Sequence, residues 1–342
     1  MMTNGTNSDI ETSVAIRFGI TFNRYQINDI NYRVALANNS AVDKPLVILV
    51  HGFPECWYSW RHQIAPIVQA GYRLAIPDVR GYGGSDCPAS VTAYDLQTLS
   101  SDMASLAQQL SPGQPSIIIG HDWGAPIAWN SALLHPTQFR AVGGLSVPHV
   151  PPGDILATDL FKKIFTDRGL FFYMLYFQSE GVAEAELEAD PERSIRLFYT
   201  AIAGDATEGA WPLSKPVDSK LFDGVQEPDM PRPWLSNEDV HYYARQFSSS
   251  GFHGPLNRYR NFERDNRYLR STGKTIIEQP SLFITGDRDM VATLYPDGPI
   301  AAMKPFATDL RVCETLKRCG HWTQQERPQE VNEIVLRWLS AL

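Results

Sequence analysis

From residue 46 to about residue 148, short apolar runs alternate with longer amphipathic stretches. The short runs predict strands at 46–51, 73–77, 116–120 and 141–146. The amphipathic stretches between them predict helices at 57–69, 94–110 and 125–134. Strands that alternate with helices are typical of a parallel sheet in which the helices form the crossover connections.

Residues 149–275 show a different pattern. They are rich in aromatic residues and helical in tendency, and Pro and Gly interrupt them at 204–216 and 228–233. No clear strand pattern is present in this part of the sequence. A proline-rich stretch at 147–152 precedes the segment and Pro280 follows it, so we expect an insertion into a single α/β unit.

The strand pattern returns near the end of the chain. Two further strands and a terminal amphipathic helix are predicted at 281–285, 309–313 and 328–339. We therefore predict an α/β core made of residues 1–148 and 276–342, with residues 149–275 inserted as a helical cap, or lid.

Composition and charge narrow the possible functions. The 342 residues are 43% hydrophobic and 20% charged, which is close to the globular average and excludes a disordered chain or a coiled coil. Asp and Glu (38) outnumber Lys and Arg (30), and no dense basic cluster is present, so nucleic acid is not expected as a partner. The apolar runs are far shorter than the roughly 20 residues that span a bilayer, so no membrane span is expected.

Cysteine usage and the chain ends bear on location. The four cysteines show neither zinc-ligand spacing nor the density of a disulfide framework, and the first residues lack the features of a secretory signal. We therefore expect a cytoplasmic protein. The terminal Ser340-Ala341-Leu342 loosely resembles a peroxisomal address, which makes the peroxisome an alternative. Monomer and homodimer both remain open.

The candidate nucleophile follows the strand predicted at 116–120. In Gly120-His121-Asp122-Trp123-Gly124, small residues flank a central Asp122, and such residues permit a strained strand-to-helix turn that exposes the central side chain. The alternative is that Asp122 only caps the helix that follows it. A carboxylate that attacks a saturated carbon forms an ester that water can hydrolyse, so we expect an alkylating electrophile such as an epoxide or an alkyl halide.

The candidate base is His321, which lies between the last predicted strand and the terminal helix. It completes the chain order nucleophile, acid, His that α/β-hydrolases use. His121 adjoins the nucleophile, but we expect its side chain to point away from Asp122 and to pack. For the orienting acid, Asp289 is preferred because it comes three residues after a glycine; Asp287 is the alternative, with a turn as its more ordinary role.

An oxyanion hole is expected at the end of the strand predicted at 46–51. That strand ends in His51-Gly52-Phe53-Pro54-Glu55. In this type of fold, the backbone N–H after His-Gly and the N–H after the nucleophile stabilise an oxyanion together. The two donors are therefore expected to be the amides of Phe53 and Trp123.

These segments together resemble the soluble epoxide hydrolases of the α/β-hydrolase fold superfamily, from about Arg33 to the C-terminus. The stretches that carry the resemblance are HGFPECWYSWR at 51–61, DVRGYGGS at 78–85, GHDWG at 120–124, YMLYFQ at 173–178, GPLNRYRN at 254–261 and CGHWT at 319–323. The resemblance implies an α/β-hydrolase fold, a mostly parallel sheet flanked by helices, with a helical cap.

The resemblance also implies two cap tyrosines that hydrogen-bond the epoxide oxygen and supply a proton as the ring opens. By register these are Tyr173 and Tyr259, with Tyr176 as the alternative to Tyr173 because it shares a helix face with it. Phe53, Trp123 and the two tyrosines are then expected to bind the substrate. Arg258 stands where the mammalian enzymes carry Trp, which is expected to alter the pocket wall.

We therefore expect a hydrolase that needs no cofactor and no metal and that converts a small lipophilic epoxide and water to a vicinal diol through an ester on Asp122. A haloalkane dehalogenase is one alternative, although it commonly has Asn after His-Gly, where this chain has Phe53. A non-catalytic ligand receptor on the same fold is another, although binding alone does not require an intact nucleophile, acid and base.

Overall fold

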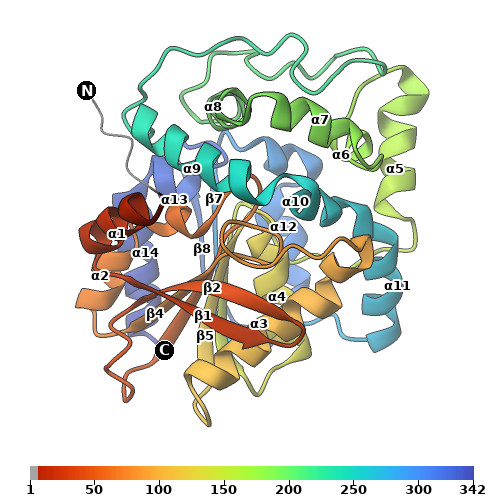
Figure 1. The fold of residues 1–342 in the computed structure, drawn as a ribbon. Coiled ribbons are helices and arrows are strands. Elements are labelled where there is room, and N and C mark those ends of the chain that lie inside the picture. Colours follow the sequence, from red (N-terminus) through yellow and green to blue (C-terminus); the bar gives the residue numbers. More distant parts are fainter. Residues whose placement is uncertain (1–6) are drawn as a thin grey trace.

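A computed structural model describes residues 7–342, so residues 1–6 of the predicted first core segment lie outside the described part. At its centre is an eight-stranded sheet in the order β1-β2-β4-β3-β5-β6-β7-β8 (Figure 1). The strands are β1 (Thr21–Ile27), β2 (Ile30–Ala37), β3 (Leu46–Val50), β4 (Arg73–Pro77), β5 (Ser116–His121), β6 (Phe139–Leu145), β7 (Ser281–Gly286) and β8 (Leu310–Leu316). β1 pairs with β2 and β2 with β4 in antiparallel orientation, and the other neighbours pair in parallel. The predicted α/β class with a mostly parallel sheet is confirmed.

All six predicted strands are present as β3 to β8, within a few residues of the predicted ends. The sequence pattern does not predict β1 and β2. β1 is an edge strand in which Ile27 alone is buried, so it contains no apolar run. In β2 the buried Arg33, which pairs with Asp78, interrupts the apolar residues. A charged residue in a buried strand hides the pattern that normally marks such a strand.

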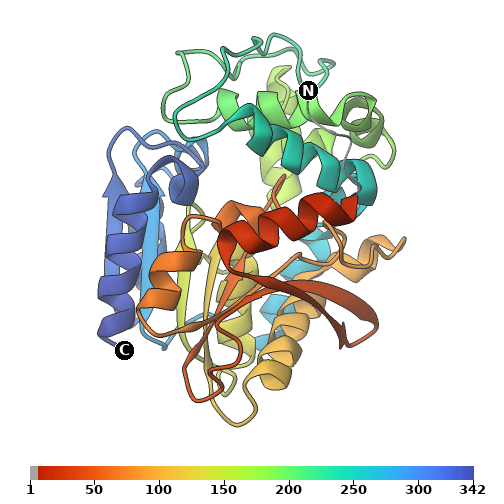
Figure 2. The same ribbon diagram turned by 60° about the vertical axis from the view of Figure 1, so that its left-hand side comes forward.

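Helices cover both faces of the sheet. Those of the core are α1 (Asn7–Phe18), α2 (Ile64–Gln69), α3 (Leu96–Leu110), α4 (Gly124–Leu134), α12 (Pro299–Met303), α13 (Thr323–Glu326) and α14 (Pro328–Ser340). α2 and α14 contact each other and lie on one face, whereas α3 and α4 pack together on the other (Figure 2). Short 3₁₀ turns complete the core: η1 (Trp57–Trp60), η2 (Val91–Tyr94), η5 (Met290–Leu294) and η6 (Lys304–Phe306).

Two predicted helices are shorter than expected. Residues 57–69 divide into η1 and α2, and Pro66 falls in the first turn of α2, where its missing N–H needs no partner. Residues 94–110 divide into η2 and α3, with Asp95 between them. The Asp95 side chain accepts a hydrogen bond from the amide of Thr98 at 2.7 Å and so caps α3.

The segment between β6 and β7 is helical. It contains α5 (Ala157–Ile164), η3 (Thr166–Arg168), α6 (Tyr173–Tyr176), α7 (Val182–Ala189), α8 (Pro191–Ala201), α9 (Asn237–Ser250), α10 (His253–Asn257), η4 (Tyr259–Asn261) and α11 (Phe262–Thr272). In both views this helical segment lies above the sheet (Figures 1 and 2). Among the described residues, no helix is long and apolar enough to cross a membrane.

Helix α9 is fastened to the core by side-chain hydrogen bonds from η1. The indole N–H of Trp57 donates to the Tyr242 hydroxyl at 2.9 Å, and the hydroxyls of Ser59 and Tyr243 lie 2.9 Å apart. These groups are buried, so each bond satisfies polar atoms that water does not reach. The helical segment is thereby fixed over the strand ends, where the site is found.

Candidate active site

Asp122 lies in a tight turn between β5 and α4, with a φ of +49°. A Cβ at Gly120 would overlap the carbonyl of Gly124 and lie 2.6 Å from the Ala125 amide nitrogen. A Cβ at Gly124 would overlap the Val50 carbonyl. Both glycines are therefore required by close backbone approach. The strained turn holds the Asp122 carboxylate above the end of the sheet.

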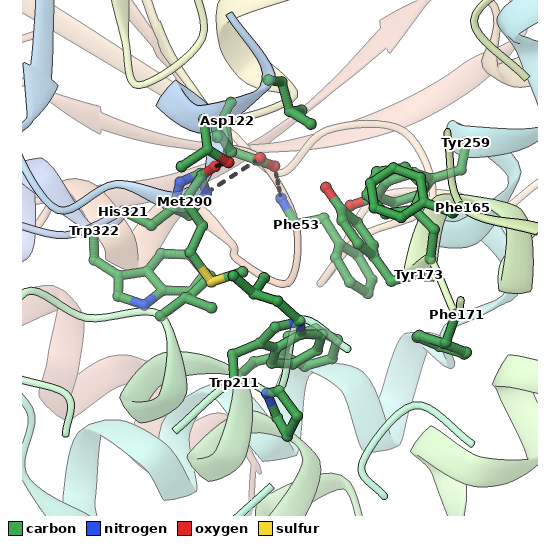
Figure 3. A pocket seen from close by; sticks show the side chains of 18 residues that line it. Phe53, Asp122, Phe165, Phe171, Tyr173, Trp211, Tyr259, Met290, His321 and Trp322 are labelled. Carbon is green, nitrogen blue, oxygen red and sulfur yellow. Dashed lines mark hydrogen bonds and ion pairs between the residues drawn. The ribbon is translucent and has the colours of Figure 1, made fainter. Parts of the chain in front are cut away.

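The two oxygens of the Asp122 carboxylate have different partners (Figure 3). Oδ1 accepts a hydrogen bond from the Phe53 amide at 2.8 Å, and Oδ2 lies 3.3 Å from Nε2 of His321. Gly52 makes room for this arrangement, because a Cβ there would overlap Oδ1 and lie 2.7 Å from the Trp123 amide nitrogen. Of the two amides predicted for the oxyanion hole, that of Phe53 therefore bonds to this carboxylate.

His321 is hydrogen-bonded on both sides of its ring. Its Nδ1 lies 3.0 Å from Oδ1 of Asp289, and the same Asp289 oxygen accepts the Val291 amide at 2.9 Å. Burial alone would lower the pKa of His321, but the charges of Asp289 and Asp122 and their hydrogen bonds hold the pKa well above its ordinary value. Burial opposes ionisation of Asp289, but the charge of His321 and their hydrogen bond still lower its pKa. The resting site thus contains an imidazolium between two carboxylates.

The alternative acid and the second histidine lie elsewhere. Asp287 accepts the Cys319 amide at 3.4 Å and lies 3.7 Å from the Lys317 ammonium, as a turn residue would. The ring of His121 is hydrogen-bonded to groups other than Asp122. Its Nδ1 lies 2.8 Å from Glu55 and its Nε2 lies 2.7 Å from the carbonyl oxygen of His321, and its ring packs against Trp322 with centroids 5.9 Å apart.

Sequence reasoning gives no role to two residues that hold the site together. The buried carboxylate of Glu55 accepts the Gly52 amide at 2.6 Å as well as His121, and so connects the loop of Phe53 to the backbone of His321. The Ser146 hydroxyl donates to the same His321 carbonyl at 2.8 Å. Glu55 is the last residue of the motif at 51–55, and that motif could have indicated a role for it. Ser146 has no comparable signal.

A cavity lies between Asp122 and the helical segment (Figure 3). The residues that line it are Phe53, Asp122, Phe165, Phe171, Phe172, Tyr173, Phe198, Ile202, Trp211, Pro212, Leu213, Tyr259, Met290, Val291, Thr293, Leu294, His321 and Trp322. The phenol rings of Tyr173 and Tyr259 have centroids 6.1 Å apart, and their hydroxyls lie close together on the side that faces Asp122. Burial and the Asp122 charge raise the pKa of both phenols, so both are protonated at rest.

Tyr176 does not reach this cavity. Its hydroxyl donates to Glu186 at 2.7 Å, whereas Tyr173, one helical turn earlier, lines the cavity. α6 is a single turn of helix, so the way it packs decides which of the two tyrosines faces Asp122.

Arg258 is not among the residues that line the cavity, and its effect on the pocket wall stays a prediction. Its guanidinium lies 4.4 Å from the centroid of a Trp123 ring and forms a buried ion pair with Asp265. The Trp123 side chain in turn packs edge-on against Tyr259, with ring centroids 5.1 Å apart. Arg258 therefore packs against Trp123, which in turn packs against the cavity residue Tyr259.

A known protein family and several known proteins match this chain. A family model described as alpha/beta hydrolase fold matches residues 45–328. The chain is 39% identical over 319 residues to epoxide hydrolase A of Mycobacterium tuberculosis, which covers 92% of this chain and 96% of that protein. The chain belongs to the epoxide hydrolases of the α/β-hydrolase superfamily. The predicted family is therefore confirmed.

Two further epoxide hydrolases support this membership. Bifunctional epoxide hydrolase 2 of Sus scrofa is 38% identical over 298 residues, which covers 87% of this chain and 52% of that protein, so this chain spans about half its length. The solved structure of an epoxide hydrolase from an endophytic Streptomyces matches with a TM-score of 0.87 at 40% identity, covering 94% of this chain and 96% of that one.

Within residues 7–342, no group of three or more His, Cys, Asp or Glu side chains is arranged to hold a metal ion.

Proposed function

We propose that this epoxide hydrolase converts small lipophilic epoxides to vicinal diols in two steps, through an ester on Asp122. The observation that carries the proposal is the position of the Asp122 carboxylate across the cavity from the hydroxyls of Tyr173 and Tyr259. An epoxide between them would present a carbon to the carboxylate and its oxygen to the phenols. Residues 149–275, as a cap, would provide both the phenols and most of the apolar wall.

In the first step Asp122 opens the ring. Oδ1 is held by the Phe53 amide, so Oδ2 is the oxygen that forms the bond to the epoxide carbon. The carbon–oxygen bond of the ring breaks, and a phenol proton passes from Tyr173 or Tyr259 to the oxygen that leaves. An alkoxide is a poor leaving group, and a positioned acid lowers its charge as the bond breaks.

In the second step His321 activates water against the ester carbonyl. Ester formation removes the negative charge of Asp122, one of the two charges that keep the imidazole protonated, and the pKa of His321 falls as a result. The proton that His321 releases can return to the phenolate left by the first step. The neutral ring, oriented by Asp289, can then accept a proton from the attacking water and pass it to the alkoxide that leaves the ester, and the acid proton of the released Asp122 restores the imidazolium. The amides of Phe53 and Trp123 are placed to stabilise the oxyanion as the ester is cleaved to the diol.

We further propose a reducing, cytoplasmic environment. Cys56, Cys87, Cys313 and Cys319 are all free thiols in the structure. Free thiols without disulfides are typical of proteins kept in reducing compartments.

Trapping the ester tests the proposed function. In His321→Gln the first step can proceed but the base is missing, so the intact mass should rise by the mass of one epoxide after incubation with trans-stilbene oxide. The double variant Asp122→Asn/His321→Gln is the matched control and should gain no mass. An unmodified His321→Gln protein, or equal labelling of the control, would contradict the proposal. Halide release from a bromoalkane in place of diol formation would favour a dehalogenase.

A further inference from the structure

The cavity wall is almost free of charge away from its reactive end. Among the described residues that line the cavity, none is a lysine or an arginine. The Thr293 hydroxyl, one of few polar groups beyond the catalytic cluster, already donates to the Met290 carbonyl at 2.6 Å. The rest of the wall is mostly aromatic and aliphatic, so a charged group on a substrate would lose its water here without gaining a counterion.

The reactive end adds net negative charge. The carboxylates of Asp122 and Asp289 surround the single imidazolium of His321, to which Asp122 lies at 3.3 Å and Asp289 at 3.0 Å. Two negative charges against one positive charge leave one negative charge close to the reacting carbon. A second anion in the cavity is therefore repelled, in a site where little water is present to screen the repulsion.

One buried cation, Lys215, contacts residues of the wall, but its ammonium group donates hydrogen bonds to backbone carbonyl oxygens of its own loop. The ammonium of Lys215 lies 4.3 Å from the ring centroid of Phe171 and 5.0 Å from that of Trp211, both of which line the cavity. Lys215 itself is 6% exposed and does not line the cavity. It donates to the carbonyl oxygens of Leu221 at 2.5 Å and Lys220 at 3.4 Å. Lys215 therefore holds its own loop together and contacts the backs of wall residues.

We propose that the site selects electrically neutral epoxides and discriminates against epoxides that carry a carboxylate on the part of the molecule enclosed by the cavity. This inference rests on the proposed function and names its substrate class. Neutral aryl and alkyl epoxides, or lipid epoxides with a masked acid, fit the wall. A short acidic epoxide does not, because its carboxylate would be buried without a partner.

A matched substrate series tests the proposal. Three trans-stilbene oxides with para substituents CH2COO⁻, CH2CONH2 and CH2CH3 are nearly equal in size, and the methylene keeps the substituent from altering the reacting carbon electronically. The proposal predicts that kcat/KM for the carboxylate is about tenfold or more below that for the carboxamide, with the ethyl compound at least as fast as the carboxamide. A carboxylate that reacts as fast as the carboxamide would overturn the inference and leave the proposed function standing. Absence of diol from all three would contradict both.

Two variants test the electrostatic cause. Leu213 lines the cavity but is 71% exposed, so a cation introduced there would face the cavity and keep its water. Leu213→Arg should raise the ratio of carboxylate to carboxamide rates several-fold over that of the uncharged control Leu213→Met. An unchanged ratio in Leu213→Arg would overturn the explanation.

Discussion

The backbone N–H of Phe53 donates a hydrogen bond to Oδ1 of Asp122 across 2.8 Å, although the two residues are 69 positions apart in the chain. The bond joins the loop after β3 to the turn after β5. These two strands are neighbours in the parallel sheet, so their carboxyl ends place the two loops side by side. One carboxylate oxygen is thereby fixed, while the other stays available to the cavity.

Gly52 is predicted to be irreplaceable for activity. In Gly52→Ala the new Cβ would overlap Oδ1 of Asp122 and crowd the Trp123 amide, so both the nucleophile and the oxyanion hole would shift. Loss of one oxyanion-hole donor typically reduces kcat about 10²–10³-fold, and we expect a loss at least that large. Steady-state kinetics on the folded variant, checked by circular dichroism, measures it. Activity near that of the wild type would show that this loop does not serve the reaction.

Removal of the hydroxyl from each of three tyrosines is predicted to affect the rate differently, according to where that hydroxyl lies. Tyr173→Phe and Tyr259→Phe each remove a hydroxyl that faces Asp122, and each should slow formation of the ester about 10²-fold or more. Tyr176→Phe, whose hydroxyl bonds Glu186 outside the cavity, is the matched control and should change the rate less than about twofold. Rapid-quench measurement of the first turnover gives these rates. Equal effects of all three substitutions would contradict the assignment.

The strands β3 to β7 could be predicted because each contains a buried apolar run, such as Leu46–Val50, whereas in β8 Leu316 alone is buried. β1 and β2 could not, because their hairpin joins an exposed edge strand to a strand that carries the buried Arg33. Arg33 is paired with Asp78, which lies far along the chain, and such a partner is invisible to local periodicity. The predicted division into core and cap stays a prediction.

The residues of the site could be named from the sequence where the chemistry requires a fixed local pattern. Asp122 stands between two glycines that the backbone needs, and Asp289 follows a strand end at the spacing of the fold. The position of Tyr173 over Tyr176, and of Arg258 behind Trp123, depends on how single turns of helix pack, which local sequence does not encode. The catalytic roles of these residues remain predictions.

The pKa of His321 is predicted to depend on Asp122. With both carboxylates present the pKa is held well above its ordinary 6.5, so the ring stays protonated at neutral pH. Asp122→Asn removes one negative charge, and the pKa should fall. Because the folded pKa is the raised one, the ion pairs stabilise the protein at pH values below about 6.5, and this contribution is lost as pH rises through the folded pKa. Imidazole NMR titration of both proteins measures the difference; identical titration curves would contradict it.

Arg258 is predicted to matter for stability through Asp265. Both side chains are buried and paired, so Arg258→Met would leave the carboxylate of Asp265 without its charged partner and with the Leu96 amide as a remaining donor, at a cost of about 3–5 kcal/mol. The double variant Arg258→Met/Asp265→Asn should recover part of that loss, because it removes the unpaired charge. Urea denaturation of the three proteins tests this. A single variant as stable as the wild type would show that the pair contributes little.

The central claim is that Asp122 forms a covalent ester, and the origin of the diol oxygen tests it most directly. Enzyme in excess over trans-stilbene oxide, in water enriched in ¹⁸O, is limited to one turnover, and the diol is analysed by mass spectrometry. The account predicts unlabelled diol, because the new oxygen comes from the Asp122 carboxylate, which takes up the label instead. Labelled diol from the first turnover would mean that water attacks the epoxide directly, and would contradict the covalent mechanism.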